Sequence, residues 1–104
     1  MFAAIRRYEA IDRNRTTELV KKTEDTLLPR LSELPGFNGY YLIEADNGVF
    51  SSVGIFDTAA DAQASTRVAA DWVRQEKLET ALPNPPEVTN GEIVVHKAGE
   101  LVEA

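Results

Sequence analysis

Few side chains of this sequence belong to types that can carry out acid–base or electrostatic chemistry. His96 is the only histidine among 104 residues, so its imidazole can act alone as a general base but cannot join a multi-histidine metal site. Arg6 and Arg7 are neighbours in an expected strand, so their side chains point to opposite faces. The inward arginine needs a partner, either a carboxylate such as Glu44 or Glu92 or an anionic or enolic ligand oxygen. The candidate catalytic residues are therefore His96, Arg6 and Arg7, with an ordinary surface position as the alternative for the histidine.

Aromatic side chains supply the candidate pocket. Tyrosine hydroxyls set against apolar rings suit a phenolic ligand, although such residues also simply fill protein interiors. Trp72 lies on the apolar stripe of an expected helix, where core packing is the simpler interpretation. The candidate pocket residues are Tyr8, Tyr40, Tyr41, Phe56 and Trp72.

Composition limits the partners and cofactors. Eleven Lys and Arg against seventeen Asp and Glu give a formal net charge of -6, which argues against nucleic acid or anionic lipid as the main partner. The sequence contains no cysteine, hence no disulfide and no thiolate metal site, and no glycine-rich phosphate loop. We expect no metal and no organic cofactor. Without a recognisable signal peptide or membrane span, we expect a cytoplasmic protein.

The elements that must position these residues follow from the hydrophobic pattern. Alternating apolar residues predict strands at 1–9, 37–45, 49–56 and 92–97, with Asp46-Asn47-Gly48 as the tight turn between the second and third. Apolar residues at spacings of three and four predict a helix at 17–34, kinked at Pro29, and a second helix from 59 that Thr58 caps.

This order of elements predicts the fold class. Residues 1–104 form a single α+β domain of ferredoxin-like β-α-β-β-α-β type, in which two helices cover one face of a four-stranded antiparallel sheet. Residues 98–104 are expected to be a polar tail.

The strands at 37–45 and 49–56 carry apolar side chains on both faces. Two helices can bury only one face, so a monomer would leave a large apolar patch in water. A second copy whose sheet packs against this one would cover the patch and form a dimeric α/β barrel with the helices outside. We therefore predict a homodimer, with Phe50 and Val53 as candidate interface residues.

Short motifs carry a resemblance to a known family. Residues 35–41 read Pro-Gly-Phe-Asn-Gly-Tyr-Tyr after the first helix, and a strand ending in Phe56-Asp57-Thr58 leads into the second helix. Nearly the whole chain thus resembles the antibiotic biosynthesis monooxygenase-like domains of the dimeric α/β barrel superfamily. For members that are enzymes, the resemblance implies either oxidation of polycyclic quinol-type substrates without metal or flavin, or degradation of haem.

The resemblance also argues against haem degradation here. Haem-degrading members carry an Asn on the first strand, a Trp that closes the third strand and a His in the second helix. In this chain the first strand has no Asn, Phe56 stands at the Trp position, and Ser65 or Thr66 stands near the His position.

Three functions are compatible with these residues. The first is a cofactor-independent monooxygenase for a small aromatic or quinol-type compound, in which Arg6 or Arg7 stabilises the substrate anion and His96 or a tyrosine moves the proton. The alternatives are a non-catalytic dimer that binds a small molecule in the same pocket, and a structural or regulatory dimer whose tail contacts a partner.

Overall fold

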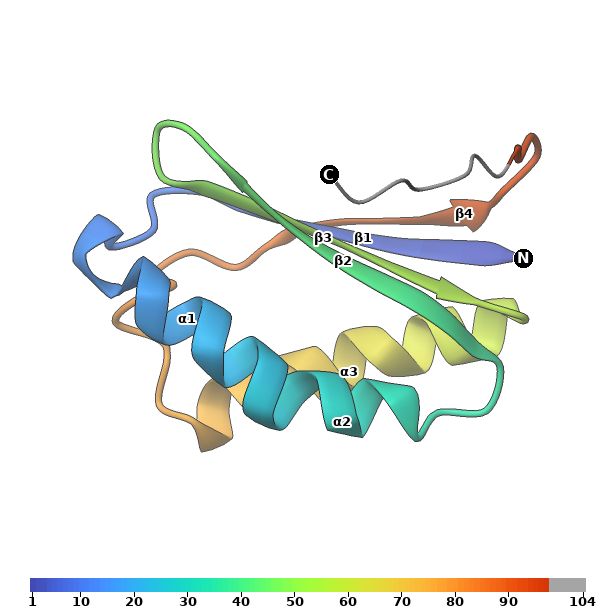
Figure 1. Cartoon of the computed structure of the whole chain (residues 1–104), viewed down its shortest axis with the longest axis horizontal. Helices are drawn as coiled ribbons and strands as arrows, with labels where there is room; N and C mark the ends of the chain where they lie inside the picture. The colour runs from blue at the N-terminus through green and yellow to red at the C-terminus, as the bar shows by residue number, and fades with distance from the viewer. Residues whose placement is uncertain (98–104) are drawn as a thin grey trace, which may run out of the picture.

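Four antiparallel strands form one sheet, and helices cover one of its faces (Figure 1). The structure is a computed structural model that describes residues 1–97. The strands are β1 (Phe2–Tyr8), β2 (Phe37–Ala45), β3 (Val49–Phe56) and β4 (Glu87–Glu92). They are ordered β2-β3-β1-β4, so β1 lies inside the sheet while β2 and β4 form its edges. The predicted α+β fold, with helices on one face of an antiparallel sheet, is confirmed.

The first helical run is irregular. A short 3-10 turn, η1 (Arg13–Arg15), precedes α1 (Thr16–Lys22), the π-helical segment η2 (Thr23–Leu27) and α2 (Leu28–Ser32). At the end of η2 the Leu28 backbone N–H donates to the Thr23 carbonyl, five residues back. Pro29 then falls in the first turn of α2, directly after η2, and has no N–H to donate to the preceding turn. The irregularity predicted at Pro29 therefore takes the form of a wider turn just before it.

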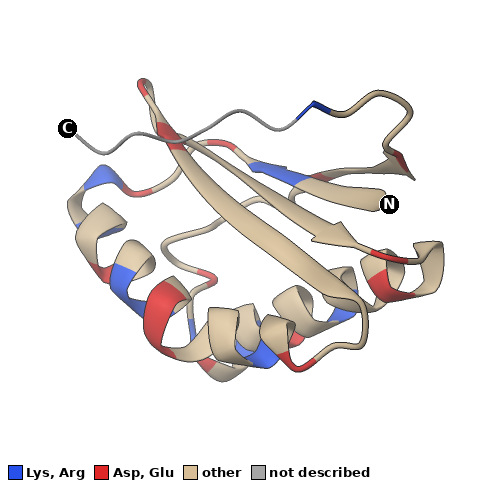
Figure 2. Cartoon of the chain, turned by 45° about the vertical axis from the view of Figure 1, so that its right-hand side comes forward, with Lys and Arg blue, Asp and Glu red and all other residues tan. Residues whose placement is uncertain are grey.

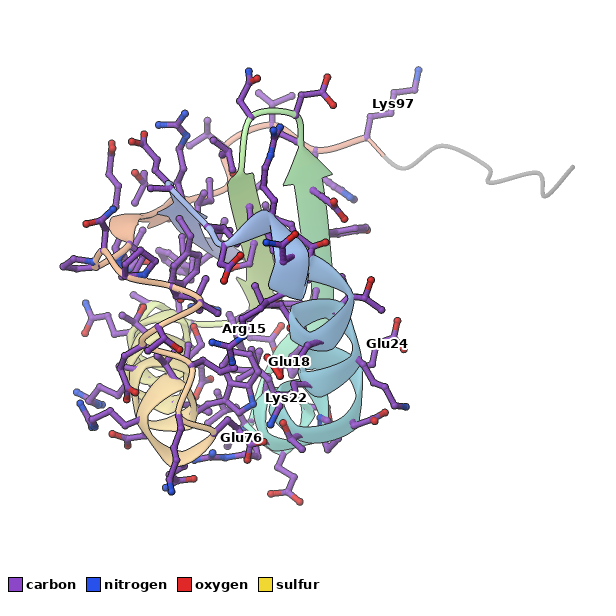
Figure 3. All side chains as sticks on the ribbon, turned by 90° about the vertical axis from the view of Figure 1, so that its left-hand side faces the viewer. Arg15, Glu18, Lys22, Glu24, Glu76 and Lys97 are labelled. Carbon is purple, nitrogen blue, oxygen red and sulfur yellow. The ribbon has the colours of Figure 1, made fainter. Side chains whose placement is uncertain are left out.

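The second helix, α3 (Ala59–Gln75), packs against β1 and β3. Thr58 caps it as predicted: its hydroxyl accepts a hydrogen bond from the Asp61 N–H at 3.1 Å and donates to Asp61 Oδ2 at 2.9 Å. The Lys22 ammonium and Glu76 carboxylate lie 3.1 Å apart between the two helical runs (Figure 3). Among residues 1–97, no helix has the length and apolar character needed to cross a membrane.

The prediction for the last strand was wrong, because β4 ends at Glu92, where the strand was expected to begin. Antiparallel pairing with β1 places Glu87 opposite Arg7 and Glu92 opposite Phe2. The Ile93 N–H still donates to the Met1 carbonyl at 2.8 Å, next to Phe2, the first residue of β1. Val94 and Val95, whose strand propensity favoured 92–97, are 82% and 87% exposed. The extent of pairing with β1, and not local propensity, thus sets the end of β4.

The two faces of the sheet differ sharply. We call the side covered by the helices the helix face and the opposite side the outer face. Pairing between β1 and β3 places Phe50 on the helix face, where it is buried in the main core, and Val53 opposite Ile5 on the outer face. Phe50 therefore cannot belong to a sheet-to-sheet contact, which corrects its assignment as an interface residue, because side chains in a strand alternate between faces.

The outer face carries exposed apolar side chains. Tyr41 and Ile43 of β2 are 59% and 50% exposed, and Ile5 of β1 is 37% exposed. Most of the length of β2 and β3 carries no charge, whereas charged residues recur along the helices (Figure 2). The expected apolar surface on both sides of these strands is therefore present.

Candidate functional site

A small cavity lies between the helix face of the sheet and the first helical run. Its volume is about 30 Å³, which accommodates about two water molecules, since one needs about 10–15 Å³. We call it the inner cavity. Polar and aromatic groups from five elements meet apolar side chains at its wall: Arg6, Tyr8, Thr23, Tyr40, Ser52 and Trp72 together with Leu19, Leu27, Leu42, Phe50 and Leu82.

A larger pocket adjoins the inner cavity and shares Arg6, Tyr8 and Leu82 with it. Its volume is about 440 Å³, within the range of pockets that bind small organic molecules. We call it the outer pocket. Its remaining wall comes from α3, the segment before β4 and β4 itself, namely Thr66, Ala70, Val73, Glu79, Pro83, Asn84, Pro85, Pro86 and Val88.

Arg6 is the central polar residue of this site. Pairing places it opposite Ser52 of β3 and Val88 of β4, in the middle of the helix face, and it is only 2% exposed. Within residues 1–97 its Nη1 has no hydrogen-bond partner, and no carboxylate lies within ion-pair distance. Glu44 and Glu92, the partners considered from the sequence, are both exposed and unpaired with it. A buried guanidinium that cannot lose its charge thus faces a cavity without a counter-ion.

Two tyrosine hydroxyls accompany the arginine. Burial raises the pKa of Tyr8 and of Tyr40, and the positive charge of Arg6 opposes that rise at both residues. The nearby Ser52 hydroxyl lowers the pKa of Tyr40 to a smaller extent, although the geometry of the two hydroxyls does not meet that of a formed hydrogen bond. Both phenols therefore stay protonated at neutral pH and act as hydrogen-bond donors or acceptors, not as bases.

Trp72 joins the two helical runs at the cavity wall. Its indole Nε1–H donates to the Thr26 hydroxyl at 2.6 Å, and the side chain is only 4% exposed. The Thr23 hydroxyl donates to the Leu19 carbonyl at 2.7 Å in the same helical run. Trp72 thus belongs to the core, as the simpler interpretation held, and also lines the inner cavity.

The other candidates from the sequence lie elsewhere. Arg7 is half exposed on the outer face and pairs with Glu9. Tyr41 is exposed on the same face, and Phe56 is buried in a separate cluster where it packs edge-on against Phe37, ring centres 5.9 Å apart.

His96 lies beyond the end of β4, is exposed, and lines neither the inner cavity nor the outer pocket. Four of the eight candidates thus meet at one site: Arg6, Tyr8, Tyr40 and Trp72.

Ser52 and Thr66 are site residues that sequence reasoning did not select. Ser52 stands between Phe50 and Gly54 on the buried face of β3. A hydroxyl is unexpected at a buried strand position, and this feature of the sequence could have identified Ser52 as a site residue. Thr66 was considered only for its place near a histidine of haem-degrading proteins. Nothing in the sequence shows that it lines a pocket, because that depends on how α3 lies against β4.

No protein-family model matches the sequence, and no curated protein is significantly similar to it. Solved structures match the fold. An antibiotic biosynthesis monooxygenase matches with a TM-score of 0.67 at 14% identity, covering 91% of this chain and 100% of the other. The monooxygenase from the gene ActVA-Orf6 of Streptomyces coelicolor, in complex with Nanaomycin D, matches with a TM-score of 0.65 at 15% identity, covering 99% and 92%.

The chain has the fold of the antibiotic biosynthesis monooxygenases. A dimeric ferredoxin-like protein from an uncultured marine organism has it too, with a TM-score of 0.70 at 17% identity and coverage of 95% and 92%. The same fold occurs in a protein of unknown function from Nitrosomonas europaea. At these identities the likeness establishes the fold, and chemistry must be argued from the site.

Proposed function

We propose that this protein is a cofactor-independent monooxygenase that acts on a small aromatic, quinol-type compound. The observation that carries the proposal is Arg6, a buried cation without a counter-ion at the junction of the inner cavity and the outer pocket. An anionic substrate oxygen would supply the missing charge. The fold shared with the Streptomyces coelicolor monooxygenase that binds Nanaomycin D supports this choice.

In this mechanism the protein lowers the pKa of the bound substrate. Arg6 stabilises the enolate or quinolate that forms when the substrate loses a proton, and Tyr8 and Tyr40 donate hydrogen bonds to the same oxygen. We assign the proton to water rather than to His96, since that imidazole lies outside both spaces in this chain. The apolar wall around Trp72 limits competing water and keeps the local field strong.

The electron-rich anion then reacts with dioxygen. For a ring methylene beside the enol carbon, one oxygen atom of O₂ becomes the new carbonyl oxygen. The other leaves as water with the two methylene hydrogens. The carbon is oxidised by four electrons and O₂ is reduced by four, so no external reductant is needed.

Oxygen consumption by metal-free protein with a panel of quinols and anthrones tests the proposal. We expect turnover by the natural sequence, a loss of about 10²–10³ in kcat for Arg6→Met, and little change for the control Arg7→Met, whose side chain lies on the outer face. Turnover that appears only after metal or flavin is added would rule out this mechanism.

A non-catalytic binding protein is the second candidate. It is favoured by the protonated state of the site tyrosines, which leaves the wall of the inner cavity, as formed by residues 1–97, without an evident base. Saturable binding of quinols or their anions without oxygen uptake would support it over the enzyme.

We also propose that the outer faces of two copies pack together. Tyr41, Ile43 and Ile5 form an apolar surface that water would otherwise contact, and a protein of the same fold is described as dimeric. Light scattering should give about 23 kDa, twice the chain mass of 11.5 kDa; a stable monomer would contradict this assembly. The alternative in which the tail contacts a partner concerns residues 98–104, which lie outside the described residues.

A further inference from the structure

Within residues 1–97, three buried side-chain polar atoms have no hydrogen-bond partner: Arg6 Nη1, Ser52 Oγ and Thr66 Oγ1. Each of them belongs to a residue that lines the inner cavity, the outer pocket or both. Buried polar groups in native proteins are nearly always satisfied, so each exception calls for an explanation. Their clustering indicates that one ligand satisfies all three.

The three groups sit on two different walls. Arg6 and Ser52 lie opposite each other on neighbouring strands of the sheet, at the inner cavity. Thr66 belongs to α3 and lines the outer pocket, which Arg6 also reaches. Apart from Glu79 and Asn84, the rest of the outer pocket is apolar, with Val73, Leu82 and Val88 among its residues. A ligand that contacts Arg6 and Ser52 on one wall and Thr66 on the other must therefore carry polar atoms at two ends of an apolar body.

The sizes of the two spaces limit how the ligand lies. At about 30 Å³ the inner cavity admits only one or two non-hydrogen atoms, whereas the outer pocket of about 440 Å³ takes one or two rings. The acidic oxygen must therefore sit at the inner end and the body in the outer pocket.

The charged side chains around the site limit the ligand to one negatively charged group. Among residues 1–97, Arg6 is the only cationic residue that lines either space, and Glu79 adds a carboxylate to the outer pocket. A second negative charge on the ligand would have no partner and would meet this carboxylate. The group that faces Thr66 is therefore neutral.

Bound water alone does not account for these atoms. Two waters in the inner cavity can satisfy the hydroxyl of Ser52 and the N–H of Arg6, but they leave the guanidinium charge uncompensated in a buried site. An anion meets both requirements.

We propose that the site takes a small aromatic monoanion with a second, neutral hydrogen-bonding group: the acidic oxygen binds Arg6 and Ser52, and the neutral group binds Thr66. The inference rests on the proposed function only in taking this site as the substrate site. It adds the ligand's charge, its two polar ends and the residue that selects the second one.

Binding of four probes tests the inference: benzoate, 3-hydroxybenzoate, 4-hydroxybenzoate and neutral methyl benzoate. Trp72, the only tryptophan, lines the inner cavity and reports occupancy by fluorescence, with calorimetry as a second readout. We expect benzoate to bind at least about tenfold more tightly than methyl benzoate. We expect one hydroxybenzoate to bind about 3- to 10-fold more tightly than benzoate, as one hydrogen bond to a hydroxyl provides.

Matched variants assign each effect to a residue. Thr66→Val keeps the shape but removes the hydroxyl, so the hydroxybenzoate advantage should vanish while benzoate affinity stays the same. Thr66→Ser, the control, should retain the advantage. Arg6→Met should remove the preference for the anion. Circular dichroism shows whether each variant is folded.

Three results would overturn the inference: no saturable binding of any of the anions, equal affinity for the neutral ester, or a hydroxybenzoate advantage that survives in Thr66→Val. None of these measurements requires turnover. Binding as described without oxidation of quinols would refute only the monooxygenase, whereas quinol oxidation without binding of these anions would refute only the ligand class.

Discussion

Replacing Arg6 by methionine should make the unliganded protein more stable. The guanidinium is 2% exposed and has no carboxylate partner within residues 1–97. A buried charge without a partner costs several kcal/mol even after the surroundings relax. Methionine fills a similar volume with an apolar, flexible chain and removes that cost.

The gain is reduced by what Arg6 does for its neighbours. Its charge acts on the Tyr8 and Tyr40 hydroxyls, and loss of such a partner costs about 1 kcal/mol for each hydroxyl. The net effect on the free energy of unfolding is therefore about 1–2 kcal/mol in favour of Arg6→Met. For a domain of this size that corresponds to a rise in Tm of about 5–15 °C.

Urea and thermal unfolding of the natural sequence, Arg6→Met and Arg7→Met provide the assay. Arg7 is half exposed and pairs with Glu9 on the surface, so its replacement should change the free energy of unfolding by no more than about 0.5 kcal/mol. Added benzoate should raise the Tm of the natural sequence but not that of Arg6→Met. An Arg6→Met protein destabilised by more than about 1 kcal/mol would refute the reasoning, because it would mean that Arg6 serves the fold and not a ligand.

Three further predictions concern the scaffold. Thr58→Ala should lower the free energy of unfolding in urea by about 1 kcal/mol through loss of the α3 cap, and Thr58→Ser should restore it. Because burial raises the pKa of Tyr8 and Tyr40 above 10.0, the unfolded chain ionises first. Stability should therefore be full below about pH 10 and fall as the pH rises toward the folded pKa values, less steeply in Tyr8→Phe; a flat profile would contradict this. Val53→Asp should give a folded monomer by light scattering, whereas Phe50→Asp should unfold; a native Val53→Asp dimer would exclude the outer face.

Local signals in the sequence predicted the elements but not how they combine. The Thr58 cap, the Asn47-Gly48 turn and the helical periodicity each depend on neighbouring residues, and the structure has all three. Because side chains alternate along β1, either Arg6 or Arg7 had to point toward the helices, but the alternation alone did not decide which. That choice depends on pairing with Ser52, far along the chain. The error in the last strand has the same origin, because β4 ends opposite Phe2, the first residue of β1, and not where its own sequence favours a strand.

The π-helical segment keeps the buried side of the first helical run facing the sheet. Its buried positions Leu19, Thr23, Leu27 and Leu31 are four residues apart throughout. In a regular α-helix each step of four residues rotates the stripe by about 40° beyond a full turn, so a straight helix would carry Leu31 away from the sheet. A π-helical segment has more residues per turn and corrects this drift, and η2 lies in the middle of the stripe.

The same turn places functional groups. Thr23 and Leu27, at the two ends of η2, both line the inner cavity, and Thr26 between them accepts the hydrogen bond from the Trp72 indole. Pro29 favours the π-helical segment because proline has no backbone N–H. Even a regular α-helix could not form the bond from residue 29 to the Asp25 carbonyl, so the wider turn loses nothing at this position. A four-residue repeat that continues into a proline can therefore be read as a signal for a π-helical segment, and here that segment forms the wall opposite Arg6.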